Sequence, residues 1–277
     1  MPAPKLMKSK LKDTRYGFLN SDPDAFSKYI TIIRDTLPSS LQLPVYLSEW
    51  GISPSHRELL NDTCYSAAYF VRNILLNLNR LESFGHWCLT DWMKELAFPD
   101  TLFHGGLGFF TYNGIKKPSY HAYHFLSKLQ KNILVNKEGC CISVDDTENH
   151  FSILLYNYSH FSDLYAQGFN LDFSPTERYH VFPNAVDKEI SFTLTGIPKG
   201  KYTIRQHIVN RKHGSCFDTW ISMGAEELHT PEEVERLANL SQPLIIRNTC
   251  LLDNPSYHFT YTLEPLEIRL VEFFRKH

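Results

Sequence analysis

The spacing of hydrophobic positions divides the chain into two parts. Up to about residue 132, apolar residues recur at the three- and four-residue intervals of helices, with short continuous apolar runs between them. After about residue 135, several segments alternate apolar and polar residues, as half-buried strands do. The pattern predicts an α/β region followed by a mostly β region.

Three helices are predicted in the first part. The first is the segment "SDPDAFSKYITIIRDTL", where Ser21 can serve as N-cap and Pro23 suits the first turn. The second runs from about residue 62 to 81, with Asn61 or Asp62 as its cap. The third starts at Pro118. Each has an apolar face that must pack against something else.

Two short apolar strands flank the second helix. Residues 45–48 lack polar alternation, which is typical of a strand covered on both faces, and "HWCLT" forms another short strand after Gly85. A strand, a helix and a strand at this spacing predict a parallel βαβ unit. The long polar and glycine-rich segment 91–117 follows, and loops of such length are usually functional.

The second part predicts an antiparallel β-sandwich. Turn signals such as Pro198-Lys199-Gly200 separate its strands, and Thr230 with Glu233 forms a capping box for one inserted helix, "PEEVERLANL". Five segments carry the strand pattern: "FSILLYNYS", "EISFTLTGI", "KYTIRQHIV", "SYHFTYTL" and "LEIRLVEFF".

Composition narrows the class of protein. The 277 residues suffice for one large or two smaller domains, and a net charge of −2 provides no attraction for nucleic acid or an anionic membrane. No apolar stretch has the length of a membrane span. The six cysteines form no C-x-x-C pair, and the basic start lacks the apolar core of a secretory leader. We therefore expect reduced thiols, a cytoplasmic protein and no bound metal or cofactor; "GGLG" lacks the lysine and Ser/Thr of a phosphate loop.

Carboxylates and aromatic rings gather at the ends of the two predicted strands. Glu49 ends the first strand and Asp91 follows the second, and the carboxyl ends of parallel strands meet at one edge of a sheet. Three tryptophans lie close by in sequence: Trp50, Trp87 and Trp92. Acceptors for hydroxyls beside flat apolar rings suit a sugar site. The alternative is structural: Glu49 caps a loop or pairs with Arg57, and the tryptophans are core residues.

Four blocks point to a known family: "PVYLSEW", "NDTCYSAAYFVRNIL", "HWCLTDWMKE" and "FHGGLGFFTYNGIKKPSYHAYHFLSKL". In order and spacing, residues 41–130 resemble the late part of the catalytic barrel of glycoside hydrolase family 39, the β-xylosidase family. The β region behind them is similar to that family's appended β-sandwich. The resemblance implies the C-terminal portion of a (β/α)8 barrel over residues 1–132 and a β-sandwich domain over 133–277.

The resemblance also implies roles for particular residues. The nucleophile of this retaining family is the glutamate of a T-E-W-N block, which corresponds here to Ser48-Glu49-Trp50-Gly51, so that a glycine replaces the asparagine. In the family's eighth-strand block, a tryptophan walls the sugar subsite and the last glutamate binds hydroxyls; Trp87 and Glu95 match them, with Lys94 where an acid often stands. The histidine of the H-G-G block shapes the loop near the pocket. The residues expected to bind substrate are Trp50, Trp87, Asp91, Glu95 and His104.

A second carboxylate, the acid/base, is not found. The family has it in an N-E-P block on the fourth strand, and this chain contains no such block; "LEPLE" around Glu264 lies in a β pattern with other surroundings. The first six barrel strands are not recognisable either. We therefore expect this chain alone to be inactive, as a fragment, the product of a split or truncated gene, or one piece of a complex that an upstream domain or partner chain completes.

Three functions remain open at this point. The first is part of a retaining glycosidase acting on β-xylosides or related small glycosides. The second is a sugar-sensing domain without turnover, because the chain also resembles family 39 domains fused to AraC-type regulators. The third is an inactive remnant. The expected ligand is a small saccharide or glycoside, with no membrane or direct nucleic-acid contact, and oligomers are compatible with the sequence.

Overall fold

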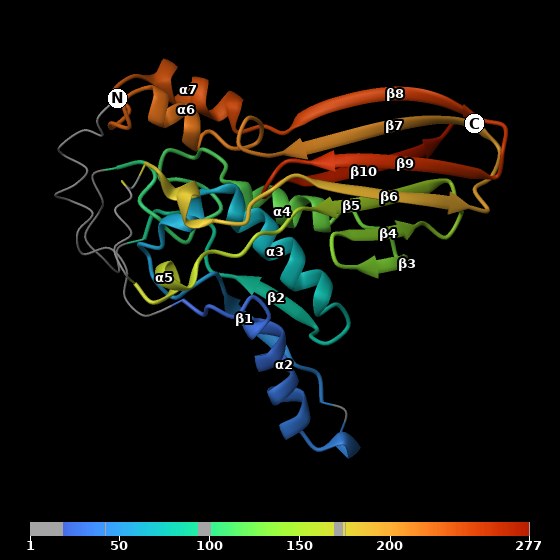
Figure 1. Cartoon of the computed structure of the whole chain (residues 1–277), viewed down its shortest axis with the longest axis horizontal. Helices are drawn as coiled ribbons and strands as arrows, with labels where there is room; N and C mark the ends of the chain where they lie inside the picture. Colours follow the sequence, from blue (N-terminus) through green and yellow to red (C-terminus); the bar gives the residue numbers. More distant parts are fainter. Residues whose placement is uncertain (1–18, 42, 94–100, 169–173, 175, 277) are drawn as a thin grey trace.

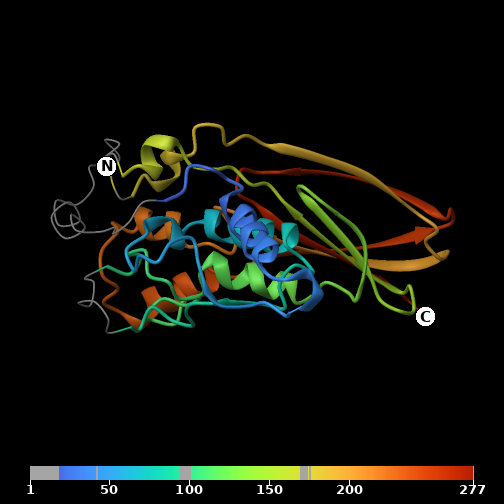
Figure 2. The same cartoon turned by 90° about the horizontal axis from the view of Figure 1, so that it is seen from below.

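The computed structural model describes residues 19–41, 43–93, 101–168, 174 and 176–276. Its arrangement is mixed α/β with antiparallel sheets. Long antiparallel strands extend from one end, and the helices and a short parallel strand pair gather at the other (Figure 1). Seen from below, the helices α3 (Cys64–Leu76) and α4 (Pro118–Leu126) lie side by side (Figure 2).

The first part contains the predicted strand–helix–strand unit. Strand β1 (Tyr46–Trp50) pairs in parallel with β2 (Ser83–His86), and α3 connects them. Helix α2 (Ala25–Thr36) precedes the unit and α4 follows it. The predicted parallel pairing and the helix start at Pro118 are confirmed.

The predicted helix caps in this part are wrong. Helix α2 begins at Ala25 after Asp24, which makes no side-chain capping bond, and not after Ser21. Helix α3 begins at Cys64 after Thr63. Asp62 cannot cap it, because its carboxylate is buried in ion pairs with two cationic side chains.

Strand β1 was expected to be covered on both faces, which is also wrong. Tyr46 is 66% exposed, Glu49 is exposed, and Trp50 is the buried residue of the strand. One face of the parallel pair is therefore open among the described residues. The strand predicted at 86–90 is wrong, since β2 covers Ser83–His86 and shares only His86 with it. Gly85 lies inside the strand and does not break it; a Cβ there would lie 2.3 Å from the carbonyl oxygen of Ser48, so this close pairing requires glycine.

Two antiparallel sheets make up the second part. The larger has the order β3-β4-β5-β10-β7-β8, and the smaller pairs β6 with β9. Their strands are β3 (Asn132–Lys137), β4 (Cys140–Val144), β5 (His150–Tyr156), β6 (Lys188–Thr195), β7 (Gly200–Val209), β8 (Leu244–Leu252), β9 (Ser256–Leu263) and β10 (Ile268–Arg275). All five predicted strands are present, and the last one lies centrally, between β5 and β7.

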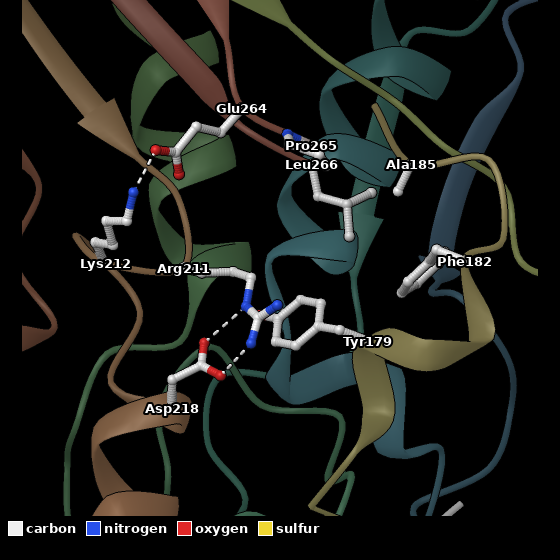
Figure 3. A pocket seen from close by; sticks show the side chains of 9 residues that line it. All are labelled: Tyr179, Phe182, Ala185, Arg211, Lys212, Asp218, Glu264, Pro265 and Leu266. Atoms are coloured by element: carbon white, nitrogen blue, oxygen red, sulfur yellow. Dashed lines mark hydrogen bonds and ion pairs between the residues drawn. The ribbon is translucent and has the colours of Figure 1, made fainter. Parts of the chain in front are cut away.

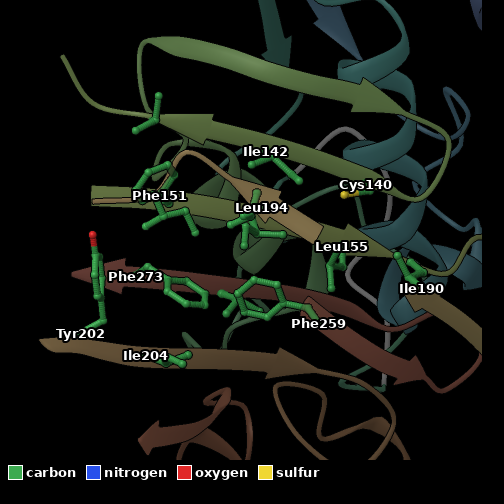
Figure 4. Packing of buried hydrophobic residues seen from close by; sticks show 14 of the residues in the cluster. Cys140, Ile142, Phe151, Leu155, Ile190, Leu194, Tyr202, Ile204, Phe259 and Phe273 are labelled. Carbon is green, nitrogen blue, oxygen red and sulfur yellow. The ribbon is translucent and has the colours of Figure 1, made fainter. Parts of the chain in front are cut away.

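One hydrophobic cluster fills the space between the two sheets (Figure 4). Phe259 of the smaller sheet packs edge-on against Phe273 of the larger one, with ring centroids 4.8 Å apart. Leu194 and Ile204 belong to the same cluster. This burial holds the smaller sheet against the larger one, and the Arg269 guanidinium of β10 adds a hydrogen bond to the carbonyl oxygen of Thr262 in β9 at 3.2 Å.

The opposite face of the larger sheet is covered by α3 and α4. Val71 and Phe125 from these helices share a second hydrophobic cluster with Leu154 of β5 and Leu270 of β10. Both faces of the larger sheet are therefore occupied, and the two parts of the chain share one core.

Short helices occupy the connections. They are η1 (Ser39–Leu41), η2 (Leu59–Asp62), α5 (Asp163–Ala166), η3 (Arg178–Val181), α6 (Phe217–Ser222) and α7 (Pro231–Leu240). The predicted capping box of α7 is confirmed, with the Glu233 amide donating to Thr230 and the Thr230 amide donating to the Glu233 carboxylate. All six cysteines are free thiols. In the part of the chain that the structure describes, no helix is suited to cross a membrane.

Replacing Thr230 by alanine should lower the free energy of unfolding by about 1 kcal/mol, because the Glu233 amide loses its acceptor. Urea denaturation followed by circular dichroism measures the change. Glu235→Ala is the matched control, since it removes an exposed side chain of the same helix. Equal stability losses in the two variants would contradict the capping role.

Candidate functional site

The parallel strand pair brings Glu49 and Trp87 to one edge. The amide of Trp87 donates to the carbonyl oxygen of Trp50 at 3.3 Å, which continues the pairing of β1 with β2 by one residue. The carboxyl ends of the two strands therefore lie side by side. The Glu49 side chain is exposed, and Trp87 is 39% exposed.

Both side chains belong to the open face of the pair. Trp50 and His86 are register partners, and both turn toward the helices, where the His86 ring packs edge-on against Phe70 of α3, with ring centroids 4.9 Å apart. The register of β1 is irregular between Leu47 and Trp50, so exposure and not alternation separates these side chains. Glu49 is exposed and Trp87 is 39% exposed, whereas Trp50 is only 8% exposed.

Trp50 lies in the core and not beside Glu49. Only 8% of it is exposed, its ring stacks on Phe26 at 4.6 Å, and its indole N–H donates to the Tyr123 hydroxyl at 2.7 Å. The ring is covered by protein on the helix side of β1. Its role there is to hold β1 against α2 and α4, which does not fit its assignment as a substrate-binding residue.

Asp91 is buried in a network of charges. Its carboxylate accepts from the Lys117 ammonium at 3.1 Å and from the Gly108 amide at 2.7 Å. Lys117 also contacts Asp62 at 2.8 Å and donates to the Gly106 carbonyl oxygen at 2.6 Å. The side chains of all three charged residues are 0% exposed.

The network extends to η3 and to the glycine-rich loop. Arg178 pairs with Asp62 at 2.9 Å and donates to the carbonyl oxygen of Phe103. The Gly105 amide donates to Asp62 at 2.6 Å. A Cβ on Gly106 would lie 2.4 Å from Asp91 Oδ1, so the close approach of this loop to the carboxylate requires glycine. The network thus anchors the loop that follows the Trp87 edge.

Burial and pairing move the pKa values of these groups in opposite directions. Burial raises the pKa of Asp62, but Lys117 and Arg178 outweigh it and hold that pKa below its usual value. Burial and the nearby Asp62 raise the pKa of Asp91 to about 6, against the lowering effect of Lys117. Burial lowers the pKa of Lys117, yet the two carboxylates together raise it, so Lys117 stays protonated.

His104 lies at the edge of this network. It is 2% exposed, and its Nδ1 lies 3.2 Å from the Thr101 carbonyl oxygen. Burial lowers the pKa of His104 to about 4, so the ring is neutral near pH 7. Its placement is consistent with shaping the loop 104–108. Among the described residues, no group of three His, Cys, Asp or Glu side chains could hold a metal ion.

Two residues of the expected site region, Lys94 and Glu95, lie outside the described residues. The structure thus places the backbones of Glu49 and Trp87 at the neighbouring ends of two paired strands, and Asp91 and His104 lie close to each other in the buried region near their loop. The last two line a small recess with Met93 and Leu107.

Sequence reasoning missed Lys117 and Arg178. Lys117 sits one residue before the helix-starting Pro118, where a lysine is ordinarily taken as a solvated side chain. The sequence shows no obvious partner for Asp62 or Asp91. That absence is too weak a signal to identify a buried ion pair. Asp62 was noted only as a helix cap.

Comparisons with known proteins identify the family of this chain. The family model of glycosyl hydrolases family 39 matches residues 20–251. A β-xylosidase of Geobacillus stearothermophilus is 25% identical over 230 residues, covering 83% of this chain and 41% of that protein. An uncharacterised HTH-type transcriptional regulator of Staphylococcus aureus is 24% identical over 181 residues, covering 65% of this chain and 22% of that protein.

The fold has solved counterparts as well. The crystal structure of a monomeric β-xylosidase from Caulobacter crescentus CB15 superposes with a TM-score of 0.79 at 22% identity. The superposition covers 94% of this chain and 54% of that one. The chain thus spans about half, or less, of the length of the proteins that it matches. With the match of the family model over residues 20–251, the chain belongs to glycosyl hydrolase family 39.

Proposed function

We propose that this chain carries the nucleophile side of a retaining glycosidase site for β-xylosides or related small glycosides. The observation that carries the proposal is the pair Glu49 and Trp87, which lie at the carboxyl ends of adjacent parallel strands, on the open face. Within family 39 this is where a carboxylate nucleophile and an aromatic wall of the sugar subsite are expected.

In this proposal the parallel pair is the last portion of a (β/α)8 barrel over residues 1–132, and residues 133–277 form a β-sandwich domain. The parallel order of β1 and β2 around α3 supports the first assignment. The cluster enclosed by the two antiparallel sheets supports the second. A cytoplasmic location is part of the same proposal, supported by six free thiols.

The chemistry assigned to Glu49 is nucleophilic attack. Its carboxylate attacks the anomeric carbon, the bond to the leaving oxygen breaks, and a covalent glycosyl ester forms. Trp87 offers an apolar face to the C–H side of the sugar ring. Glu95 is proposed to bind a hydroxyl, and the buried network through Asp91 and His104 supports the adjoining loop.

The second half of the reaction requires another carboxylate about 5–5.5 Å from the first, to protonate the leaving oxygen and later to activate water. The chain has no N-E-P block to supply it. We therefore propose that this chain alone does not turn over ordinary glycosides.

A mechanism-based label tests the nucleophile. The purified chain would be incubated with 2,4-dinitrophenyl 2-deoxy-2-fluoro-β-D-xyloside, whose leaving group needs no proton. We expect one fluoroxylosyl group on the peptide that contains Glu49, detected by mass spectrometry, because no base is available to release it. Trp87→Ala should slow the labelling.

Glu49→Gln is the matched control, and it should remain unlabelled. Labelling of another residue, equal labelling of Glu49→Gln, or no adduct at saturating reagent would each contradict the proposed nucleophile.

A second candidate function is sugar sensing without turnover. The Staphylococcus aureus relative named as a transcriptional regulator favours it, as do Gly51 and Lys94 at positions where the family pattern has Asn and often an acid. Binding of D-xylose at the Glu49 face, together with no labelling by the fluoroxyloside, would support this alternative.

A further inference from the structure

A pocket of about 570 Å³ lies away from the β1–β2 edge, where several connections meet (Figure 3). Its walls come from η3, the turn after β7, α6 and the turn between β9 and β10. The volume is within the ordinary range of small-molecule sites. Nothing in the proposed glycosidase site uses it.

The pocket carries two ion pairs whose charges cancel. Arg211 holds Asp218 through two hydrogen bonds, of 3.0 and 2.6 Å. Lys212 contacts Glu264 at 2.5 Å. Two cations face two carboxylates, so a ligand with net charge of either sign would meet as much repulsion as attraction. A neutral ligand meets no such conflict.

The polar groups are held in place before any ligand arrives. The Arg211 guanidinium lies 4.0 Å from the ring centre of the half-buried Tyr179. Buried Glu267 joins the two turns, since it accepts from the Asn210 side chain at 3.1 Å and from the Glu264 amide at 3.4 Å. Such rigidity lowers the entropy lost on binding.

Donors and acceptors remain available at the rim. Among the described residues, Lys212 uses its ammonium in one contact, with Glu264, and Glu264 uses one of its two carboxylate oxygens in that contact. The other wall is apolar and is built from Phe182, Ala185, Pro265 and Leu266 (Figure 3). Paired donors and acceptors opposite an apolar wall match a molecule with hydroxyls on one side and C–H groups on the other.

We infer that this pocket binds a neutral polyhydroxylated molecule of mono- or disaccharide size, at a second site separate from Glu49. Hydroxyls, which donate and accept at once, satisfy Lys212 and Glu264 without breaking their ion pair. The apolar wall covers the C–H face of the sugar. This site goes beyond the proposed glycosidase function and does not depend on it.

The test is calorimetric titration of the whole chain with D-xylose and xylobiose as neutral probes. D-glucuronate and D-glucosamine serve as probes of similar size with negative and positive charge. Glu264→Gln and Lys212→Met alter the pocket at solvent-accessible positions, so neither substitution should disturb the packing of the core. Circular dichroism checks that each variant is folded.

We expect a neutral probe to bind, and Glu264→Gln and Lys212→Met each to weaken its affinity by about tenfold, the loss of one hydrogen bond to a charged group. Lys131→Met, which alters an exposed ion pair elsewhere, should leave the affinity within about twofold. No binding of either neutral probe would overturn the inference. Equal or tighter binding of a charged probe, or loss of binding in Glu49→Gln with the pocket variants unchanged, would do so as well.

Discussion

Replacing Lys117 by methionine is expected to lower the free energy of unfolding by about 3–5 kcal/mol, the usual cost of leaving a buried partner uncompensated. The Lys117 ammonium contacts both Asp62 and Asp91, and all three side chains are 0% exposed. Without it, Arg178 still faces Asp62, but within the described part of the chain Asp91 keeps only the amide of Gly108. Urea denaturation midpoints of the wild-type and variant chains measure the loss.

Lys131→Met is the matched control. It removes a lysine that lies 3.2 Å from Asp146, but with side-chain exposures of 78% and 64%. Exposed pairs contribute about 0–1 kcal/mol, so the control should change little. Similar losses in the two variants would show that the burial of Lys117 and its partners does not determine how much this lysine stabilises the fold. A second variant, Asp91→Asn, should cost less than Lys117→Met, because Lys117 and Arg178 both keep their contacts with Asp62.

The second large effect concerns turnover. We expect the purified chain to give no detectable hydrolysis of xylobiose or methyl β-D-xyloside. The leaving oxygen of these substrates needs a proton, and general acid help is typically worth about 10²–10⁴-fold in rate. An activated aryl xyloside should give a small release of phenolate, since its leaving group departs unaided.

Glu49→Gln separates real activity from contamination. Robust turnover of xylobiose that is lost in Glu49→Gln would contradict the prediction and would mean that another acid in this chain, or in a second copy, acts as proton donor. Activity that Glu49→Gln leaves unchanged would come from a different site or a different protein.

Much of the fold follows from local sequence signals. Helix α7 was predictable because Pro231 and the Thr230–Glu233 box mark its start within a few residues of each other. Strand β9 was predictable because buried Phe259 and Leu263 recur at even spacing. Strands β3 and β8 were missed because their side chains are mostly exposed and carry no regular apolar alternation.

The part of the site that was predictable is the part that follows from strand pairing. Glu49 lies at the end of β1 and Trp87 directly follows β2, so the parallel pairing of these strands places both at one edge. The partners of Asp91 could not be found in this way, because Lys117 is 26 residues away and is reached through the folding of the whole loop. Trp50 illustrates another limit: it directly follows Glu49 in sequence, yet its side chain is buried while that of Glu49 is exposed.

The core shared by α3, α4 and the larger sheet has a consequence for cooperativity. Val71 and Phe125 lie on one side of residue 132, and Leu154 and Leu270 lie on the other, yet all four belong to one packed cluster. A chain cut near residue 132 would leave two apolar surfaces facing water, each of which is buried only by the other. The architecture changes near residue 132, but the two regions do not form separately folding units. They should therefore unfold in one thermal transition, and replacing one region by that of a homologue should destabilise the chain.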